Sequence, residues 1–120
     1  MTGWEWVLVA VGGAVGAAGR YLTDGAVFRH SRARTFPVGT LLINVTGSAL
    51  LGALLVTANK HGLVYAGIGI GFCGGFTTFS TFTWETLALA EDGMPRAALG
   101  YVLASLVLGL TAAAITYSAA

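Results

Sequence analysis

GFCGGFTTFSTF, residues 71–82, is the stretch that decides how the chain around it folds. It lies inside an apolar segment over residues 63–90, which is longer than the ~20 residues that a helix needs to cross a bilayer. Its Gly-Gly pair weakens a helix, and threonine hydroxyls compete with the helical backbone for hydrogen bonds. We therefore predict a helix, a non-helical break near residues 74–78, and a second helix.

A continuous helix is the alternative interpretation of this segment. Gly67, Gly71 and Gly75 recur at every fourth position, so they would share one face, as is typical of closely packed membrane helices. A break at membrane depth leaves backbone carbonyls without helical partners. It persists only where protein, water or an ion satisfies those groups.

Three further apolar stretches, separated by polar turns, run over residues 4–22, 37–57 and 95–117. Each is close to the ~20 residues of a transmembrane helix. The short alternating segments that are typical of barrel strands are missing from the sequence. The chain is therefore predicted to be an all-α membrane protein, a single unit over residues 1–120 with four transmembrane helices, of which the third is broken.

The composition indicates the same class of protein. Hydrophobic residues make up 56% of the chain and charged residues 9%, whereas a soluble domain carries roughly 25% charged residues. Most of the surface must therefore face lipid. The net charge of +1 does not suggest a nucleic-acid partner, and Cys73 is the single cysteine, so no internal disulfide can form.

No sequence motif of a known enzyme class is present, so we predict that the chain is not an enzyme. It contains no HExxH, no P-loop, no paired carboxylates within a span and no cluster of cysteine and histidine. The first 19 residues hold no Lys or Arg, so the first apolar stretch is not interpreted as a cleaved secretory signal.

Two polar residues lie within the apolar stretches at positions where polarity is costly. Asn44 shares a helical face with Thr40 in the second stretch. Its spacing alone favours an interhelical hydrogen bond of roughly 0.6–2 kcal/mol, and the alternative is a donor that faces a polar pore. Arg20 ends the first stretch, where it either serves a function or extends its charge to the membrane surface.

Aromatic and hydroxyl side chains are interleaved at the end of the third stretch. Phe79 and Phe82 are three residues apart and share a helical face. Packing in the core is the default role of such rings, but their electropositive edges can also hold a small anion while neighbouring hydroxyls donate hydrogen bonds. Tyr101 and Ser105 share a face of the fourth stretch, where contact between helices is the simpler interpretation.

Taken together, these residues resemble the Fluc (CrcB) family of small fluoride channels over nearly the whole chain. The resemblance is carried by three strings: GxxxGAxxRY over residues 12–21, FPxGTLxxNxxG over residues 36–47, and GFCGGFTTFSTF over residues 71–82, followed by Glu85. Two departures are visible. Phe76 stands where we expect leucine, and Gly109 stands where some members carry a hydroxyl.

The resemblance implies a passive, fluoride-selective channel in the bacterial plasma membrane, spanning it several times. Such a channel lowers cytoplasmic fluoride and protects the cell against its toxicity. The partners implied are fluoride, the lipid bilayer and a second subunit in antiparallel orientation, in a dual-topology dimer with two pathways. Two alternatives from the residues alone are a proton-coupled cation exporter, which needs a carboxylate at mid-membrane that Glu5 and Glu85 do not supply, and a non-conducting assembly subunit.

The resemblance also implies roles for individual residues. It places Arg20 near the vestibule, and it implies that the backbone carbonyls of Gly74 and Thr77 bind a structural Na⁺ at the dimer interface. The residues that it implies along the fluoride pathway are Asn44, Phe79, Phe82, Thr40, Ser80, Thr81, Tyr101 and Ser105.

Basic residues are distributed unevenly between the two sides that four spans would define. One side would hold Arg20, Arg29, Arg32, Arg34 and Arg96, and the other only Lys60. The positive-inside rule would then place both termini outside. A chain that inserts equally in both orientations should lack such a bias. The chain thus either forms a homodimer despite the bias, which we slightly prefer because every pathway motif is present, or pairs with a homologue of opposite bias.

Overall fold

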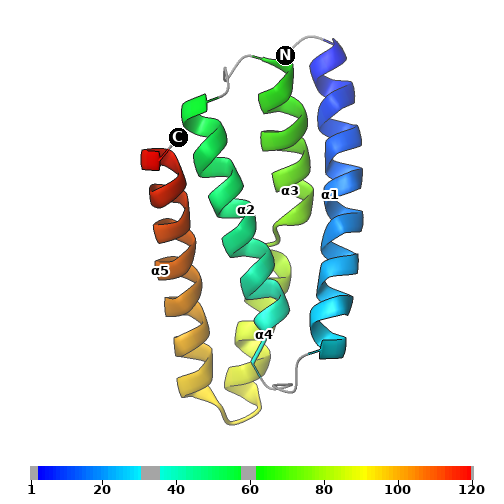
Figure 1. Cartoon of the computed structure of the whole chain (residues 1–120). Helices are drawn as coiled ribbons and strands as arrows, with labels where there is room; N and C mark the ends of the chain where they lie inside the picture. The colour runs from blue at the N-terminus through cyan, green and yellow to red at the C-terminus, as the bar shows by residue number, and fades with distance from the viewer. Residues whose placement is uncertain (1–2, 31–35, 58–61, 120) are drawn as a thin grey trace.

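The computed structural model describes residues 3–30, 36–57 and 62–119, with the side chains of residues 27–30 outside the described set. Every regular element in these ranges is helical. The elements are α1 (Gly3–His30), α2 (Val38–Thr57), the π-helix η1 (Tyr65–Cys73), α3 (Gly74–Phe76), α4 (Ser80–Glu91) and α5 (Pro95–Ala119). They form one elongated bundle, 48 × 29 × 24 Å in extent (Figure 1).

Three helical segments in the described part of the chain are long and apolar enough to cross a membrane: Gly3–Ala26, Val38–Thr57 and Pro95–Ala119. They cover the predicted stretches at residues 4–22, 37–57 and 95–117. α1 continues past its apolar part to His30, since residues 23–30 contain no proline to stop it. The predicted third stretch consists of η1, α3 and α4, none of which is long enough to cross alone.

The helices are arranged so that segments distant in sequence lie side by side. α1 packs mainly on η1, and α2 packs mainly on α5. Figure 1 shows the first turn of α1 and the last turn of α5 at the same end of the bundle, with the turn between α4 and α5 at the other end. This arrangement agrees with the prediction that both termini lie on one side.

Glycines allow the backbones of α1 and η1 to touch. A Cβ atom at Gly12 would overlap the carbonyl oxygen of Gly67, and one at Gly16 would overlap the carbonyl oxygen of Phe72. A Cβ atom at Gly75, in α3, would likewise overlap the carbonyl oxygen of Gly13. Helices in lipid gain their association energy from such close packing rather than from the hydrophobic effect. The small-residue face noted in the sequence is therefore the contact surface with α1.

A tight turn folds α5 back onto α4. Gly93 has φ = 78°, a conformation that other residues rarely adopt. The amide of Met94 donates to the carbonyl of Leu89 at 2.9 Å, which is the pattern of a Schellman C-cap, and Pro95 then begins α5. The turn places Tyr101 of α5 against α4, where its side chain is fully buried.

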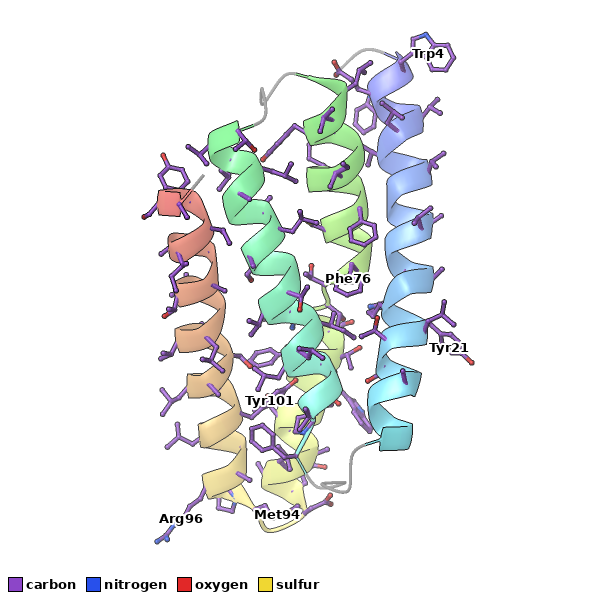
Figure 2. All side chains as sticks on the ribbon, viewed as in Figure 1. Trp4, Tyr21, Phe76, Met94, Arg96 and Tyr101 are labelled. Carbon is purple, nitrogen blue, oxygen red and sulfur yellow. The ribbon has the colours of Figure 1, made fainter. Side chains whose placement is uncertain are left out.

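The surface of the bundle is apolar over most of its length. Large hydrophobic side chains are exposed along the outer faces of α1 and α5, among them Val11, Val15, Leu103 and Leu110. Figure 2 shows Trp4, Tyr21 and Arg96 pointing away from the bundle, whereas Phe76 and Tyr101 point into it. An apolar exterior of this kind suits lipid as the surrounding medium.

We expect Gly16→Ala to destabilise the bundle, because the added methyl group meets the backbone of Phe72. The loss should be about 1–3 kcal/mol in unfolding free energy, measured by denaturant titration in detergent micelles. Gly100→Ala is the matched control, since Gly100 is exposed on α5 with no atom within 4 Å of its added Cβ. Equal stability of both variants would contradict the close contact of α1 with η1.

Candidate functional site: a polar groove between α2, the third segment and α5

Helical hydrogen bonding along the third segment stops at Thr77. The backbone of Thr77 is extended, with φ = −79° and ψ = 159°, and α4 begins only at Ser80. Both the amide and the hydroxyl of Thr77 donate to the carbonyl of Cys73, at 2.9 and 2.7 Å, which ends the preceding helix. The non-helical residues are 77–79, so the Gly74–Gly75 pair, placed in the break by the sequence analysis, is helical.

Asn44 of α2 pairs with the extended backbone that follows. Its Nδ2 donates to the carbonyl oxygen of Thr78 at 3.0 Å, and its Oδ1 accepts from the amide of Thr78 at 2.9 Å. The hydroxyl oxygen of Thr78 in turn accepts from the amide of Thr81, in the first turn of α4, at 3.2 Å. The interhelical hydrogen bond that spacing favours for Asn44 is thus made to main chain.

These side-chain contacts release two backbone carbonyls. In a continuous helix the amide of Thr78 would donate to Gly74 and the amide of Thr81 would donate to Thr77. Here Asn44 Oδ1 and Thr78 Oγ1 receive those two hydrogen bonds instead. The carbonyl oxygens of Gly74 and Thr77 have thereby lost their α-helical partners.

A groove of about 540 Å³ lies beside this interruption. It is bounded by α2, the third segment and α5, and none of the described residues that line it is charged. The lining residues with polar groups or rings at the interruption are Asn44, Ser48, Thr77, Thr78, Phe79, Phe82 and Ser105, with Cys73 and Gly74 beside them.

The two aromatic rings at the groove differ in their surroundings. The ring centroids of Phe79 and Phe82 are 6.0 Å apart, with the planes tilted by 43°. Phe79 is 78% exposed, whereas Phe82 is half-buried with its centroid 5.1 Å from that of Tyr101. One ring therefore stands free on the face of the bundle, and the other is held by α5.

Hydroxyl groups complete the polar lining. The hydroxyl of Ser105 is buried and has no hydrogen-bond partner in the described structure, so it is available to a ligand in the groove. Ser48, which the sequence analysis did not select, donates to the carbonyl of Asn44 at 2.8 Å and lines the groove. Its position four residues after Asn44, on the same helical face, was the signal that could have identified it.

Four of the candidate residues for the fluoride pathway lie away from the groove lining. Thr40 and Tyr101 are buried, and both contact Glu85. The hydroxyl of Tyr101 donates to the Glu85 carboxyl at 3.1 Å, and the hydroxyl of Thr40 is also hydrogen-bonded to it. Ser80 is exposed, with its hydroxyl 3.4 Å from that of Thr78, and Thr81 is half-buried. These two residues flank the interruption on the side of α4.

Arg20 and the two departures from the family pattern also have defined surroundings. Arg20 is half-buried on α1 and is not among the residues that line the groove. Phe76 is buried, and its ring packs beside Gly19, whose added Cβ would lie at an ordinary contact distance of 3.5 Å. A Cβ atom at Gly109 would lie 3.5 Å from the hydroxyl of Ser48, so the two face each other.

The groove offers donors for a small anion without any fixed charge. Hydroxyl groups and the amide of Asn44 are true hydrogen-bond donors, and aromatic ring edges add weak electropositive contacts. Without a lining carboxylate or ammonium, the groove neither repels an anion strongly nor traps it. Weak contacts at several positions are what passage of an ion requires.

Comparison with known proteins identifies a family. Residues 7–117 match the family described as CrcB-like protein, Camphor Resistance (CrcB). The chain is 39% identical to the fluoride-specific ion channel FluC of Methylobacillus flagellatus, over 89% of this chain and 87% of that protein. It is 47% identical to the fluoride-specific ion channel FluC of Geobacter sulfurreducens, over 85% of each chain, and 46% identical to the fluoride-specific ion channel FluC 2 of Mycolicibacterium paratuberculosis, over 92% and 88%.

Tyr101→Phe should destabilise the protein, because it removes the hydroxyl that donates to Glu85 and leaves that carboxyl partly buried with one partner fewer. We expect a loss of about 1–2 kcal/mol in unfolding free energy, measured by denaturant titration. Tyr117→Phe, at an exposed tyrosine of the same helix, should change the stability by less than about 0.5 kcal/mol. A loss of the same size in both variants would speak against the buried hydrogen bond.

Proposed function

This chain belongs to the CrcB family, and on that premise we propose that it is a subunit of a passive, fluoride-selective channel in the bacterial plasma membrane. The observation that carries the proposal is that relatives named fluoride-specific ion channels align with 85% or more of the chain. The channel lets fluoride leave the cytoplasm and so protects the cell against its toxicity. It is a transporter and not an enzyme.

The properties of fluoride itself set what a pathway must provide. Fluoride is small and strongly hydrated, so a pathway must replace its water with close donors. Hydrogen fluoride formed in acid surroundings enters the cell and dissociates, and the negative membrane potential then favours outward movement of the anion. That driving force is about 2.3 kcal/mol per charge for each 100 mV, so a passive route needs no other energy source.

The groove is the proposed pathway. Asn44, Phe79, Phe82 and Ser105 line it, and they combine amide, ring-edge and hydroxyl donors. Thr40 and Tyr101 continue the polar route toward the end of the bundle, where they meet Glu85. Ser80 and Thr81 flank the route at the start of α4, and Arg20 belongs to the vestibule.

The third crossing is proposed to be a broken transmembrane helix that consists of η1, α3 and α4. Neither the part before Thr77, formed by η1 and α3, nor the part after it, formed by α4, spans the bilayer alone. The extended backbone at Thr77 joins the two parts. Irregular backbone within a bilayer is tolerated only where protein or a water-filled cavity satisfies it. The pairing of Thr78 with Asn44 and the adjacent groove supply that condition.

A structural Na⁺ is proposed at the interruption because two backbone carbonyls there lack their α-helical partners. Gly74 and Thr77 would hold the ion through backbone oxygens, which are hard donors suited to an alkali cation. Their helical partners are taken by Asn44 Oδ1 and Thr78 Oγ1, and Gly74 is exposed, so a second subunit can approach it. When bound, the cation would link the two subunits by charge–dipole attraction.

An antiparallel dimer is the proposed assembly. Phe79 is 78% exposed, and the groove is open along its side, so another surface is needed to enclose a pathway. A second copy in the opposite orientation would bring its own Gly74 and Phe79 to the same level of the membrane. One dimer would then hold two equivalent pathways.

Fluoride efflux from proteoliposomes tests the function directly. Wild-type protein should release fluoride, and Phe79→Ile and Phe82→Ile should each reduce the rate by at least about tenfold, because isoleucine lacks the electropositive ring edge. Trp84→Leu is the matched control. Trp84 is an exposed ring of α4, the helix that carries Phe82, and it is not among the residues that line the groove. Wild-type rates in both phenylalanine variants would exclude the proposed pathway.

Expression of this gene alone in a fluoride-sensitive bacterial strain tests the composition of the dimer. Arg29 lies in the described backbone without its side chain, and Arg32, Arg34 and Lys60 lie outside the described residues, so the bias in basic residues stays a sequence argument. A homodimer predicts rescue, and cysteines introduced at Thr2 and Ala119 in a Cys73→Ala background should be labelled from both sides. Rescue only after co-expression of a second homologue would contradict the homodimer.

A further inference from the structure

The side-chain amide of Asn44 is largely occupied by the backbone of Thr78. Nδ2 donates to the Thr78 carbonyl at 3.0 Å and Oδ1 accepts from the Thr78 amide at 2.9 Å. An asparagine amide has one acceptor oxygen and two N–H donors. The pair with Thr78 therefore uses the oxygen and one N–H, and a single N–H is left for any other partner.

Thr78 in turn is bonded to the first turn of α4. Its hydroxyl oxygen accepts from the amide of Thr81 at 3.2 Å, so it is tied to the helix that carries Phe82 and that begins directly after Phe79. Phe79 follows Thr78 directly, and Phe82 lies one turn later. The position of the ring pair in the groove is thus linked through Thr78 to α2.

The surroundings leave Thr78 few other partners. Its side chain is buried at 9% exposure, and its amide and carbonyl are both paired with Asn44. Unpaired backbone groups are costly in such a place. Without Asn44, the amide of Thr78 would regain its bond most easily by pairing with the carbonyl of Gly74, which would extend the preceding helix and rotate Phe79.

We propose that Asn44 is a positioning residue that clamps Thr78 in its non-helical conformation and thereby fixes the Phe79–Phe82 pair at the groove. This role accounts for both hydrogen bonds of the Asn44 side-chain amide. It also accounts for the start of α4 one residue after Phe79. The inference rests on the proposed function, because the ring pair matters for transport only if the groove conducts fluoride. It assigns to Asn44 a role that a simple donor to the anion would not have.

The variant Asn44→Asp separates these two roles by pH. As a carboxylate, the new side chain still accepts from the amide of Thr78 but cannot donate to its carbonyl, so fluoride efflux should be lost at pH 7.5. When protonated, it offers one donor and one acceptor and restores both hydrogen bonds, yet it has no further donor for an anion. Because the protonated fraction of an aspartate rises by more than about a hundredfold from pH 7.5 to pH 5, we expect efflux of this variant, relative to the wild type at the same pH, to rise at least about tenfold.

Two controls accompany this measurement. Protein-free liposomes give the leak of hydrogen fluoride, and wild-type protein at both pH values corrects for the nearby titratable groups Tyr65, Cys73 and Glu85. Asn44→Leu, which keeps the volume and can form neither hydrogen bond, should stay inactive at both pH values. Recovery of Asn44→Leu in acid would mean that the effect does not come from the clamp.

Removal of the Thr78 amide tests the clamp with every side chain in place. Incorporation of the α-hydroxy analogue of threonine at position 78 replaces the N–H by an ester oxygen. We expect at least a tenfold loss of efflux in the otherwise wild-type protein and no further loss when the ester is combined with Asn44→Leu. Size-exclusion elution like that of the wild type shows that the protein has folded.

Wild-type efflux in the ester protein would overturn the clamp, as would losses that multiply when the ester and Asn44→Leu are combined. If efflux of Asn44→Asp does not recover at pH 5, and the ester at position 78 leaves efflux unchanged, Asn44 acts by direct contact with the anion. If the unmodified protein itself releases no fluoride, the proposed function fails rather than the clamp. In that case the ester still tests the clamp through a loss of thermal stability that is absent in the Asn44→Leu background.

Discussion

The pairing of Asn44 with the backbone of Thr78 is the contact on which the rest of this structure depends. A chain surrounded by lipid cannot leave main-chain amides and carbonyls unpaired, so any departure from a helix needs a substitute partner. Here α2 supplies that partner from 34 residues away, at 2.9 and 3.0 Å. Because the amides of Thr78 and Thr81 bond to side chains, the carbonyls of Gly74 and Thr77 lack their α-helical partners. The groove lies beside these residues.

The two ends of the bundle are stabilised by different means, and the interruption lies between them. On one side, glycines such as Gly12 and Gly16 bring α1 and η1 into backbone contact. On the other side, the turn at Gly93 returns α5 to α4 and buries Tyr101 against Glu85. Two closely packed regions therefore lie on either side of the irregular segment, which is itself held by Asn44 and by its own threonine hydroxyls.

The chemistry of the groove follows from the absence of charge in its described lining. A fixed positive charge would bind an anion tightly, and a carboxylate would repel it. Hydroxyls such as that of Ser105 and ring edges such as that of Phe79 interact more weakly, and both line the groove. Arg20 and Arg96, the basic residues whose side chains the structure describes, are not among the residues that line the groove.

The sequence by itself determined the helical class and three of the spanning segments, because hydrophobic periodicity is a local property. Its resemblance to a family pointed to Asn44, Phe79, Phe82 and Ser105, which line the groove. It placed the interruption near residues 74–78, whereas the Gly74–Gly75 pair is helical and the non-helical residues are 77–79. It also missed Ser48 and did not anticipate that Thr40 and Tyr101 would meet Glu85. Only the tertiary structure decided these points, because the partner that replaces a helical hydrogen bond is chosen by the packing of α2 against the third segment and not by the residues of that segment.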